Sequence, residues 1–381
     1  MNTSSLPLLL ERMARRRILI VGDLCLDRYT WGDAERVSPE APVLVLRVDE
    51  QENRLGGAAS VAHLARGLGA GVSLASVVGS DAEGRLIAKL LHASGIHHNA
   101  LRIDPARPTT LKERFVGRAG QRHAHQMLRV DRERREYLDR DVKVRLISAT
   151  LAQLKDCEAV LVSDDGKGVC TPRLMKAVMQ VARERSLPVA VDPARGTNYE
   201  IYRGATVITP NRLETGTAVG RTIKTIADAL SAGKELCEQF DLAHTLVTLD
   251  CDGMALATRD RESQATLEPH PDAQPAVSGQ HFPTRRREVY DVTGAGDMVL
   301  AIVGLGLAAA EPLDDAIRLA NVVAGLEVEH QGVAQVTPNE ILADLVRHGD
   351  SSKPSEAAVR PLAVERSMVP PNRSARERVL S

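Results

Sequence analysis

Short apolar runs alternate with helical patterns along most of the chain. The first run, Arg17–Gly22 (RILIVG), ends in glycine and is typical of a strand buried on both faces of a sheet. From Asp139 onward the alternation of strand and helix patterns is regular, which indicates a mostly parallel sheet covered on both faces. The predicted strands are 17–22, 72–78, 159–162, 189–191, 207–208 and 245–248, and the predicted helices begin at 58 or span 82–93, 141–154, 295–310 and 313–330.

Three further runs of β-forming residues lie in polar surroundings. They are Val43–Val48, Leu111–Val116 and Met127–Val130. We interpret them as antiparallel strands outside the main sheet that form a small lid, over about residues 29–52 and 101–132. The predicted fold class is therefore α/β, with a central mostly parallel sheet, flanking helices and a small β-sheet lid.

Both ends of the chain depart from this pattern. Leu6–Leu10 is apolar but is followed at once by charged residues, so it is too short for a signal segment or a membrane span and predicts a surface helix. One internal segment also departs from the pattern: residues 268–279 are polar with three prolines and predict an exposed loop. We predict one domain over 1–348 and a disordered tail over 349–381 that is too short for a second domain.

Composition excludes several classes of function. The chain has 49 Lys and Arg against 50 Asp and Glu, so no overall field directs it to nucleic acid or to a membrane. One Trp, five Tyr and three Phe are too few for a base-stacking surface. Five scattered cysteines predict reduced thiols in a cytoplasmic protein. His123, His125 and Arg285–Arg287 lack metal-ligand or nucleic-acid context, and we interpret them as exposed segments.

The strongest chemical signal is Asp291–Asp297 (DVTGAGD), which an apolar helix follows. Small residues allow a backbone to approach a ligand closely, and the free N–H groups of a helix start bind anions. An acid at the end of such a loop, here Asp297, can accept the proton of a hydroxyl as a phosphoryl group arrives. The alternative is a tight turn in which Asp297 only caps the helix.

This motif resembles the signature D-[TV]-[TV]-G-A-G-D of the ribokinase/PfkB family of sugar kinases, and further marks of the family follow in order over about residues 16–348. Gly22–Asp27, which we place with Asp27 at the carboxyl end of the first strand, and Gly56-Gly57 resemble the two segments that bind the sugar in that family. Thr209–Glu214 resembles the N-x-x-E motif, which acts on Mg²⁺ and phosphate. Val247-Thr248 with Gly253 resembles the loop before the nucleotide pocket.

The resemblance implies a ribokinase-like fold, ATP as phosphoryl donor, Mg²⁺, and an optional monovalent cation. It also implies a set of site residues. The catalytic residues are Asp297, Gly294, Ala295 and Gly296. The sugar-binding residues are Asp27, Gly56, Gly57, Ser60, Lys112, Arg129 and Lys167. The cofactor-binding residues are Asn211, Glu214, Thr248, Gly253 and Asn321, of which Asn211 and Glu214 hold Mg²⁺ indirectly.

Other segments are similar to a narrower family, the D-glycero-β-D-manno-heptose-7-phosphate kinases. Arg36–Val43 (RVSPEAPV) resembles their R-[IV]-S-P-E-A-P-V segment, and Ser163–Gly168 (SDDGKG) resembles their S-D-Y-[GA]-K-G segment. The resemblance implies transfer of a phosphoryl group from ATP to heptose 7-phosphate. The product would be the 1,7-bisphosphate on the way to ADP- or GDP-heptose, which are lipopolysaccharide precursors.

Three positions depart from the family pattern. Ser60 stands where Asn is usual, and it offers one hydroxyl in place of an amide donor and acceptor. Asp165 replaces a Tyr and brings an extra carboxylate close to a phosphosugar, where it repels the phosphate unless it points away or pairs with Lys167. Arg195 stands where a Lys is usual.

Two alternatives remain at this point. One is another PfkB kinase that acts on ribose, fructose or fructose 1-phosphate, and the other is a sugar-binding protein that has kept the fold and lost catalysis. Asp297 with its intact G-A-G loop argues against the second. The expected partners are a small sugar phosphate and ATP, with neither nucleic acid nor membrane. We also expect a homodimer joined through the lid, because an isolated small sheet leaves apolar faces and edges exposed.

Overall fold

The computed structural model describes residues 6–118, 124–259, 277–284, 294–329 and 336–348. In this part of the chain the main sheet has nine strands in the order β13-β12-β11-β10-β9-β8-β1-β4-β5. The pairs from β11 to β5 are parallel, whereas β12 and β13 join as antiparallel edge strands. The strands of this sheet are β1 (Arg17–Gly22), β4 (Gly71–Val78), β5 (His97–Ile103), β8 (Ala159–Ser163), β9 (Val189–Asp192), β10 (Val207–Ile208), β11 (His244–Thr248), β12 (Met254–Arg259) and β13 (Val277–Phe282).

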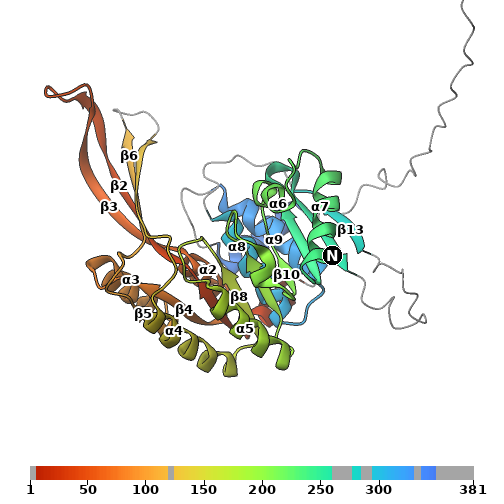
Figure 1. Cartoon of the computed structure of the whole chain (residues 1–381). Helices are drawn as coiled ribbons and strands as arrows, with labels where there is room; N and C mark the ends of the chain where they lie inside the picture. Colours follow the sequence, from red (N-terminus) through yellow and green to blue (C-terminus); the bar gives the residue numbers. More distant parts are fainter. Residues whose placement is uncertain (1–5, 119–123, 260–276, 285–293, 330–335, 349–381) are drawn as a thin grey trace, which may run out of the picture.

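Helices cover both faces of this sheet (Figure 1). They are α1 (Leu6–Ala14), α2 (Ala58–Gly67), α3 (Ala82–Ala93), α4 (Arg140–Gln153), α5 (Pro172–Glu184), α6 (Arg212–Val219), α7 (Ile226–Gln239), α8 (Ala295–Ala308), α9 (Leu313–Glu327) and α10 (Pro338–His348). Short 3-10 turns lie at η2 (Leu154–Asp156), η3 (Tyr199–Tyr202) and η4 (Asp250–Asp252).

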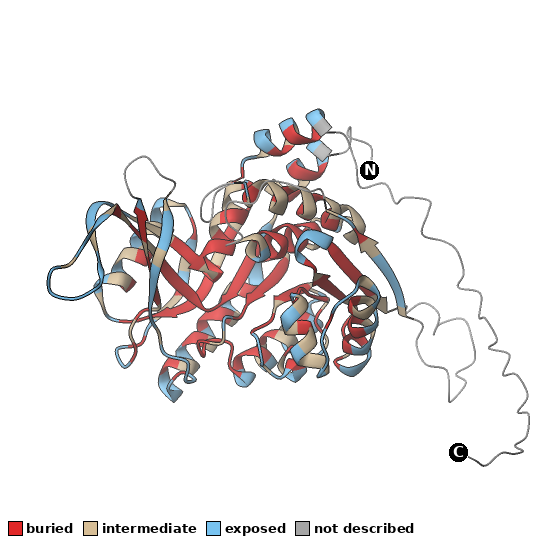
Figure 2. Cartoon of the chain, turned by 90° about the horizontal axis from the view of Figure 1, so that it is seen from above, coloured by how far each residue is buried: buried red, intermediate tan, exposed pale blue. Residues whose placement is uncertain are grey.

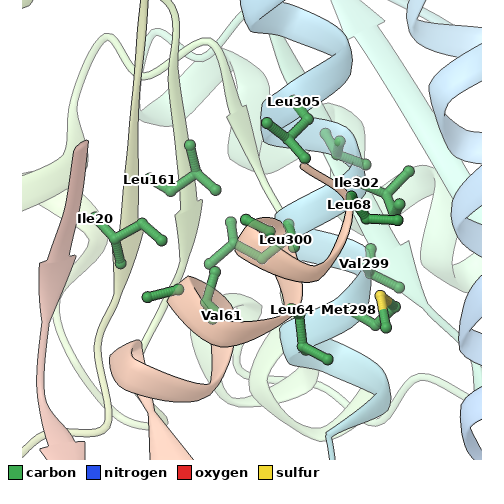
Figure 3. Close-up of a cluster of buried hydrophobic side chains, with 14 of the residues drawn as sticks. Ile20, Val61, Leu64, Leu68, Leu161, Met298, Val299, Leu300, Ile302 and Leu305 are labelled. Atoms are coloured by element: carbon green, nitrogen blue, oxygen red, sulfur yellow. The ribbon is translucent and has the colours of Figure 1, made fainter. Parts of the chain in front are cut away.

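Strand β1 shows why its residues are apolar almost throughout. Successive side chains of a strand point to opposite faces. Ile18 and Ile20 therefore enter the core on the α2 and α8 side, and Leu19 and Val21 enter the core on the α4 and α5 side. Figure 3 shows the first of these cores, where side chains of α2 and α8 meet those of β1 and β8. This central packing fixes the carboxyl ends of β1, β8 and β9 relative to the start of α8.

A second sheet forms the lid and extends away from the main sheet (Figure 1). Its strands are β2 (Leu24–Val37), β3 (Leu44–Gly57), β6 (Leu111–Arg118) and β7 (His125–Arg132), in the order β3-β2-β6-β7. The predicted lid strands correspond to β3, β6 and β7, and β6 pairs antiparallel with β7 as expected. The antiparallel prediction fails at β2, which was not among the predicted strands and runs parallel to β6. Main-sheet elements from α2 to β5 lie between β2 and β6 in the sequence, so no tight hairpin forces this pair to be antiparallel.

Several predicted boundaries need correction. Leu101–Ile103 belongs to β5 of the main sheet, so the second lid segment begins later than 101. The predicted loop 268–279 includes Val277–Gly279, which pairs with β12 as part of β13, and its remainder up to 276 lies outside the described residues. His125 begins β7 instead of lying in a loop, and it is exposed as predicted.

The N-terminal helix lies where the sequence predicts it. In α1, Leu9, Leu10 and Met13 are buried against the main core. The predicted tail over 349–381, His123 and Arg285–Arg287 lie outside the described residues. Figure 2 shows that buried residues concentrate in the main sheet, while much of the lid surface is exposed.

Candidate active site

Asp23 directly follows β1 and organises one side of the site. Its buried carboxylate accepts hydrogen bonds from the backbone N–H groups of Lys167 (2.9 Å), Val169 (3.0 Å) and Asp165 (3.2 Å). These bonds fold the segment after β8 back onto the end of β1. Burial, followed by the charge of Asp164, raises the pKa of Asp23 to about 7, although the backbone donors oppose the shift.

The glycine pair ends β3 against this same point. A Cβ atom on Gly56 would overlap the Asp27 carboxylate, and one on Gly57 would overlap the backbone oxygen of Asp23. Gly57 also has φ of 58°, a conformation that favours glycine. The N–H of Ala58 then donates to the Asp23 oxygen at 2.9 Å and starts α2. The two glycines therefore let the lid approach the main sheet closely.

Asp27 does not lie at the end of the first strand, where the sequence analysis placed it. It lies within β2, in the lid, and its buried carboxylate forms an ion pair with Arg114 of β6. Sequence reasoning missed Arg114, although it lies two residues after Lys112 on one strand and so on the same face. The guanidinium groups of Arg114 and Arg54 lie 5.1 and 4.8 Å from the ring centre of Tyr29.

Asp297 lies in the first turn of α8. The N-cap of this helix is Gly294, with φ of 102°, so the alternative in which Asp297 merely caps the helix is wrong. Ala295 and Gly296 form its first two positions, whereas residues 291–293 of the motif lie outside the described residues. The backbone N–H groups of this first turn have no partners within the helix and can receive an anion.

The surroundings of Asp297 suit a proton acceptor. Burial, then the charge of Asp165, then that of Asp27 raise its pKa from 3.8 to about 7. The Ser60 hydroxyl and the Lys112 ammonium oppose this shift. Such a carboxyl changes charge near neutral pH, where a general base is most effective. The same causes show that Asp27, Ser60, Lys112 and Asp165 lie near enough to Asp297 to act on its charge.

The three predicted phosphate-binding cations differ in position. Lys112 lies beside Asp297, and its ammonium is 3.5 Å from the Asp165 carboxylate. Burial alone would lower the pKa of Lys112, but neighbouring acidic groups raise it above its ordinary value, so this cation stays charged. The other two each have a carboxylate partner: Lys167 pairs with Glu133, and the exposed Arg129 of β7 pairs with Asp131 at 2.8 Å.

Ser60 is fully buried in α2. Within the described part of the chain its hydroxyl makes no hydrogen bond of standard geometry, although it lies close enough to the Asp297 carboxyl to lower the pKa of that group. A buried polar group without a partner costs free energy unless a ligand satisfies it. The effect on the pKa places the Ser60 hydroxyl beside the Asp297 carboxyl.

The predicted cofactor residues lie beyond Asp297, at the ends of β10 and β11. Asn211 caps α6: its side-chain oxygen accepts from the N–H groups of Leu213 and Glu214, both at 2.9 Å. The Glu214 carboxylate in turn accepts from the Asn211 N–H at 2.8 Å. Thr248 forms an isolated parallel β-bridge with Asn211, and its backbone N–H donates to the carbonyl oxygen of Pro210 at 3.0 Å. Burial raises the pKa of Glu214.

Gly253 and Asn321 both lie against the backbone carbonyl group of Phe282. The Asn321 side chain donates to the oxygen of Phe282 at 3.1 Å, and a Cβ atom on Gly253 would overlap that same oxygen. Gly253 has φ of 88°, which again favours glycine. The structure therefore brings these two residues together, on the side of Thr248 away from the lid sheet.

Asp192 connects the two halves of the site, and the sequence analysis did not select it as a site residue. It ends β9, and its Oδ2 atom would lie 4.0 Å from a Cβ on Gly296. Burial raises its pKa, and so do the charges of Glu214, Asp297 and Asp165. The rule that ligands gather at the carboxyl ends of parallel strands could have indicated it.

The acidic side chains of the site fit a metal ion that phosphates and water also coordinate better than an ion bound by protein side chains alone. Among the described residues no three His, Cys, Asp or Glu side chains are arranged to hold a metal ion. Glu214 and Asp192 nevertheless offer carboxylate oxygens, the ligand type that Mg²⁺ prefers when phosphates and water complete its shell. Mg²⁺ accompanied by a phosphate ligand therefore fits the Glu214 side of the site.

Comparison with known proteins identifies the family. Residues 15–340 match the profile of the pfkB family carbohydrate kinases. The chain belongs to this family. It is therefore a carbohydrate kinase, a phosphotransferase that acts on a sugar hydroxyl. Among the described residues no helix is both long and apolar enough to cross a bilayer.

Curated relatives extend the likeness over most of the chain. It is 42% identical over 334 residues to "Bifunctional protein HldE" of Geobacter metallireducens, covering 87% of this chain and 64% of the relative. It is 40% identical over 365 residues to the protein of that name from Geobacter sulfurreducens, covering 95% of this chain and 69% of the relative. The chain thus spans about two thirds of the length of these relatives.

Solved structures show the same fold. Ribokinase of Arabidopsis thaliana, complexed with ribose and ATP, has a TM-score of 0.62 at 19% identity, over 87% of this chain and 99% of that chain. Phosphofructokinase-2 of Escherichia coli, in complex with substrates and products, has a TM-score of 0.66 at 17% identity, over 87% and 100%. The predicted ribokinase-like fold with a mostly parallel sheet and a small second sheet is confirmed.

Proposed function

We propose that this kinase uses ATP to phosphorylate D-glycero-D-manno-heptose 7-phosphate at O1. The product would be the 1,7-bisphosphate, a precursor of ADP- or GDP-heptose. The observation that carries the proposal is the position of Asp297, a carboxyl with a pKa of about 7 beside Lys112 at the start of α8. The RVSPEAPV segment and relatives about 40% identical named HldE support the choice of sugar.

In the proposed reaction Asp297 accepts the proton of the O1 hydroxyl. The sugar oxygen then forms a bond to the γ-phosphorus of ATP as the bond from that phosphorus to the β-γ bridging oxygen breaks, and ADP leaves with the bond's electron pair. The N–H groups at the start of α8 stabilise charge on the transferred phosphoryl group. Ser60 and Asp27 orient the sugar beside the glycine pair.

The nucleotide would lie on the other side of Asp297. Thr248, Gly253 and Asn321 line this side, and Asn211 and Glu214 lie nearest to where the phosphates would be. Mg²⁺ would supply positive charge to the phosphates, held through water by the Glu214 carboxylate. A monovalent cation is a further proposed activator. The predicted cytoplasmic location agrees with five cysteines of which none forms a disulfide.

The phosphate of the acceptor would be bound by Lys112, Arg129 and Lys167. A sugar phosphate carries about two negative charges near neutral pH, so it needs local cations. Each of these three cations faces a carboxylate, on Asp165, Asp131 and Glu133 respectively. The phosphate would therefore have to replace or share these partners, which favours a dianionic acceptor over a neutral sugar.

We also propose a homodimer joined through the lid. The described lid exposes several large apolar side chains, which a second copy could cover. They are Val37, Val43, Leu44, Val48, Leu128 and Val130.

A phosphorylation screen tests the proposed substrate. Purified protein with Mg-ATP is offered heptose 7-phosphate, unphosphorylated heptose, ribose, fructose and fructose 1-phosphate, and kcat/KM is measured for each. The proposal predicts by far the highest value for heptose 7-phosphate. An equal or higher value for any other sugar would overturn the substrate but not the kinase assignment. Absence of turnover with every sugar, together with retained sugar binding, would favour a non-catalytic sugar-binding protein.

A further inference from the structure

Asp165 brings a third carboxylate to the sugar side of the site. Its Oδ2 atom is 3.5 Å from the Lys112 ammonium and would lie 3.4 Å from a Cβ on Gly57. The side chain therefore stands between the lid strand β6 and the glycine pair. It is 36% exposed, whereas the Lys112 side chain is 23% exposed.

Hydrogen bonds hold the main chain on both sides of the Asp165 side chain. The N–H of Asp165 donates to Asp23 at 3.2 Å, and the N–H of Gly166 donates to the Asp164 carboxylate at 2.8 Å. Gly166 has φ of 67°, so the chain turns sharply directly after Asp165. The backbone at Asp165 is thus held by the segment after β8, and the ion pair with Lys112 is the contact that the side chain itself makes.

We propose that Asp165 is a positioning residue: its carboxylate holds the Lys112 ammonium at the edge of the sugar site and keeps it from pairing with the base Asp297. This inference rests on the proposed role of Asp297 as the base. It concerns a residue at which this chain departs from the heptose kinases that it resembles, which have Tyr there.

The charged groups around Asp297 show why the position of the Lys112 ammonium matters. The groups that face it are Ser60 of α2, Lys112 of β6, Asp27 and Cys25 of β2, Asp165 after β8 and Asp192 of β9. Arg114 neutralises Asp27, the Cys25 thiol has a pKa raised by burial, and Asp192 has a pKa raised by burial. Lys112 is therefore the cation that acts on Asp297 in this group, and its distance from the base decides how basic Asp297 is.

In the described structure Lys112 forms its ion pair with Asp165, and no cation lies within ion-pair distance of Asp297. If Lys112 paired with Asp297, the base would lose its proton at a lower pH and would accept the sugar proton less readily. The negative charge of Asp165 has the opposite effect, because it raises the pKa of Asp297 directly. Both effects of Asp165 favour a base that works near neutral pH.

The test compares wild type, Asp165→Asn, Lys112→Met and the double variant. The charge state of Asp297 is followed by NMR titration of ¹³C-carboxyl-labelled aspartate in the protein without substrates, and Asp297→Asn assigns the signal. The pH profile of kcat/KM is measured with whichever sugar phosphate the wild type uses. Asp131→Asn, which removes a lid carboxylate paired with Arg129, is the matched control.

We expect Asp165→Asn to lower the pKa of Asp297, and with it the acid limb of the pH profile, by about one pH unit or more. Turnover at pH 8 should fall at least about threefold because the base is weaker. Adding Lys112→Met to Asp165→Asn should move the pKa of Asp297 back up, whereas Asp131→Asn should leave it unchanged. This pattern separates a charge effect from a loss of folding.

An Asp297 titration that is the same in wild type and Asp165→Asn would overturn the inference. So would a shift in Asp165→Asn that Lys112→Met does not reverse, because the lysine would then have no part in it. Failure of the proposed function looks different. The NMR titration would respond as expected, while the wild-type protein would phosphorylate no sugar.

Discussion

The Arg114 guanidinium and the Asp27 carboxylate form a buried ion pair, with side chains 8% and 6% exposed. The pair joins β6 to β2 at the base of the lid, and it neutralises one of the carboxylates around Asp297. The Asp165 carboxylate likewise forms an ion pair with the Lys112 ammonium. Among the described residues Asp297 is left without a cation at ion-pair distance, which is the condition under which a carboxylate can take up a proton.

Replacement of the base is the first test of the mechanism. Asp297→Asn keeps the shape of the side chain but removes its ability to accept a proton. Turnover should fall by at least about a hundredfold, the usual scale for loss of a general base. Binding of ATP and sugar, measured by calorimetry, should be largely retained. Near-wild-type turnover would show that another group acts as the base.

The same replacement should change how stability depends on pH. The Asp297 carboxyl keeps its proton up to about pH 7 in the folded chain but releases it near 3.8 when unfolded. Its contribution to stability is therefore full below about pH 4 and is lost as pH rises through 7. Asp297→Asn should raise Tm at pH 8 and have a smaller effect at pH 4. An equal change of Tm at both pH values would contradict the raised pKa.

Gly57 offers a test of the contact between the lid and the main sheet. Gly57→Ala adds a Cβ that overlaps the Asp23 oxygen at a φ of 58°, so both Tm and sugar affinity should fall. The matched control is Gly196→Ala, because Gly196 has φ of 76° with open space around its Cβ position. The control should show the cost of backbone strain alone. Equal sugar affinities in the two variants would mean that the overlap at Gly57 is unimportant.

Lys167→Ala tests how the enzyme chooses a phosphorylated acceptor. Charge-assisted contacts contribute about 1.5–3 kcal/mol each, so the preference for a phosphosugar over the unphosphorylated sugar should narrow by roughly ten- to a hundredfold. The affinity for ATP should barely change. Lys176→Ala, an exposed lysine on α5, is the control for loss of one positive charge. An unchanged preference would remove Lys167 from the phosphate site.

Light scattering tests the proposed lid dimer. Wild-type protein at micromolar concentration should have twice the mass of one chain, and Leu44→Asp should yield monomers by placing a charge on the exposed lid surface. Val346→Asp is the control, since Val346 is 80% exposed on α10, outside the lid. A monomeric wild type would remove the support for the dimer.

The sequence predicts the centre of the main sheet well, because strands such as β1 and β8 are buried on both faces and read as continuous apolar runs. The edge strands β5 and β13, and β12 beside β13, were not predicted. In β5 and β13 polar and half-exposed positions break the pattern. The parallel pairing of β2 with β6 depends on contacts between distant segments, which local periodicity does not record.

Residues of the candidate site were selected from the sequence where a motif carried them, and were missed where their place depends on three-dimensional neighbours. Asp297, Ser60 and Lys112 come from separate motifs, and the structure brings them together. Arg114 was missed because only the packing of β6 beside β2 gives it a partner. For Asp165 the sequence analysis named two ways to avoid repelling a phosphate, pointing away or pairing with Lys167, whereas the structure pairs it with Lys112 from the lid.

Strand β2 of the lid begins, and strand β3 ends, within the proposed sugar site. β2 starts directly after Asp23 and reaches Val37 at its far end, and β3 returns from there to Gly57. Each strand is 14 residues long, and the two pair from Val37 and Leu44 at the tip to Leu24 and Gly57 at the base. A second copy that docked on the distal tip would therefore contact the same two strands that carry Asp27 and the glycine pair.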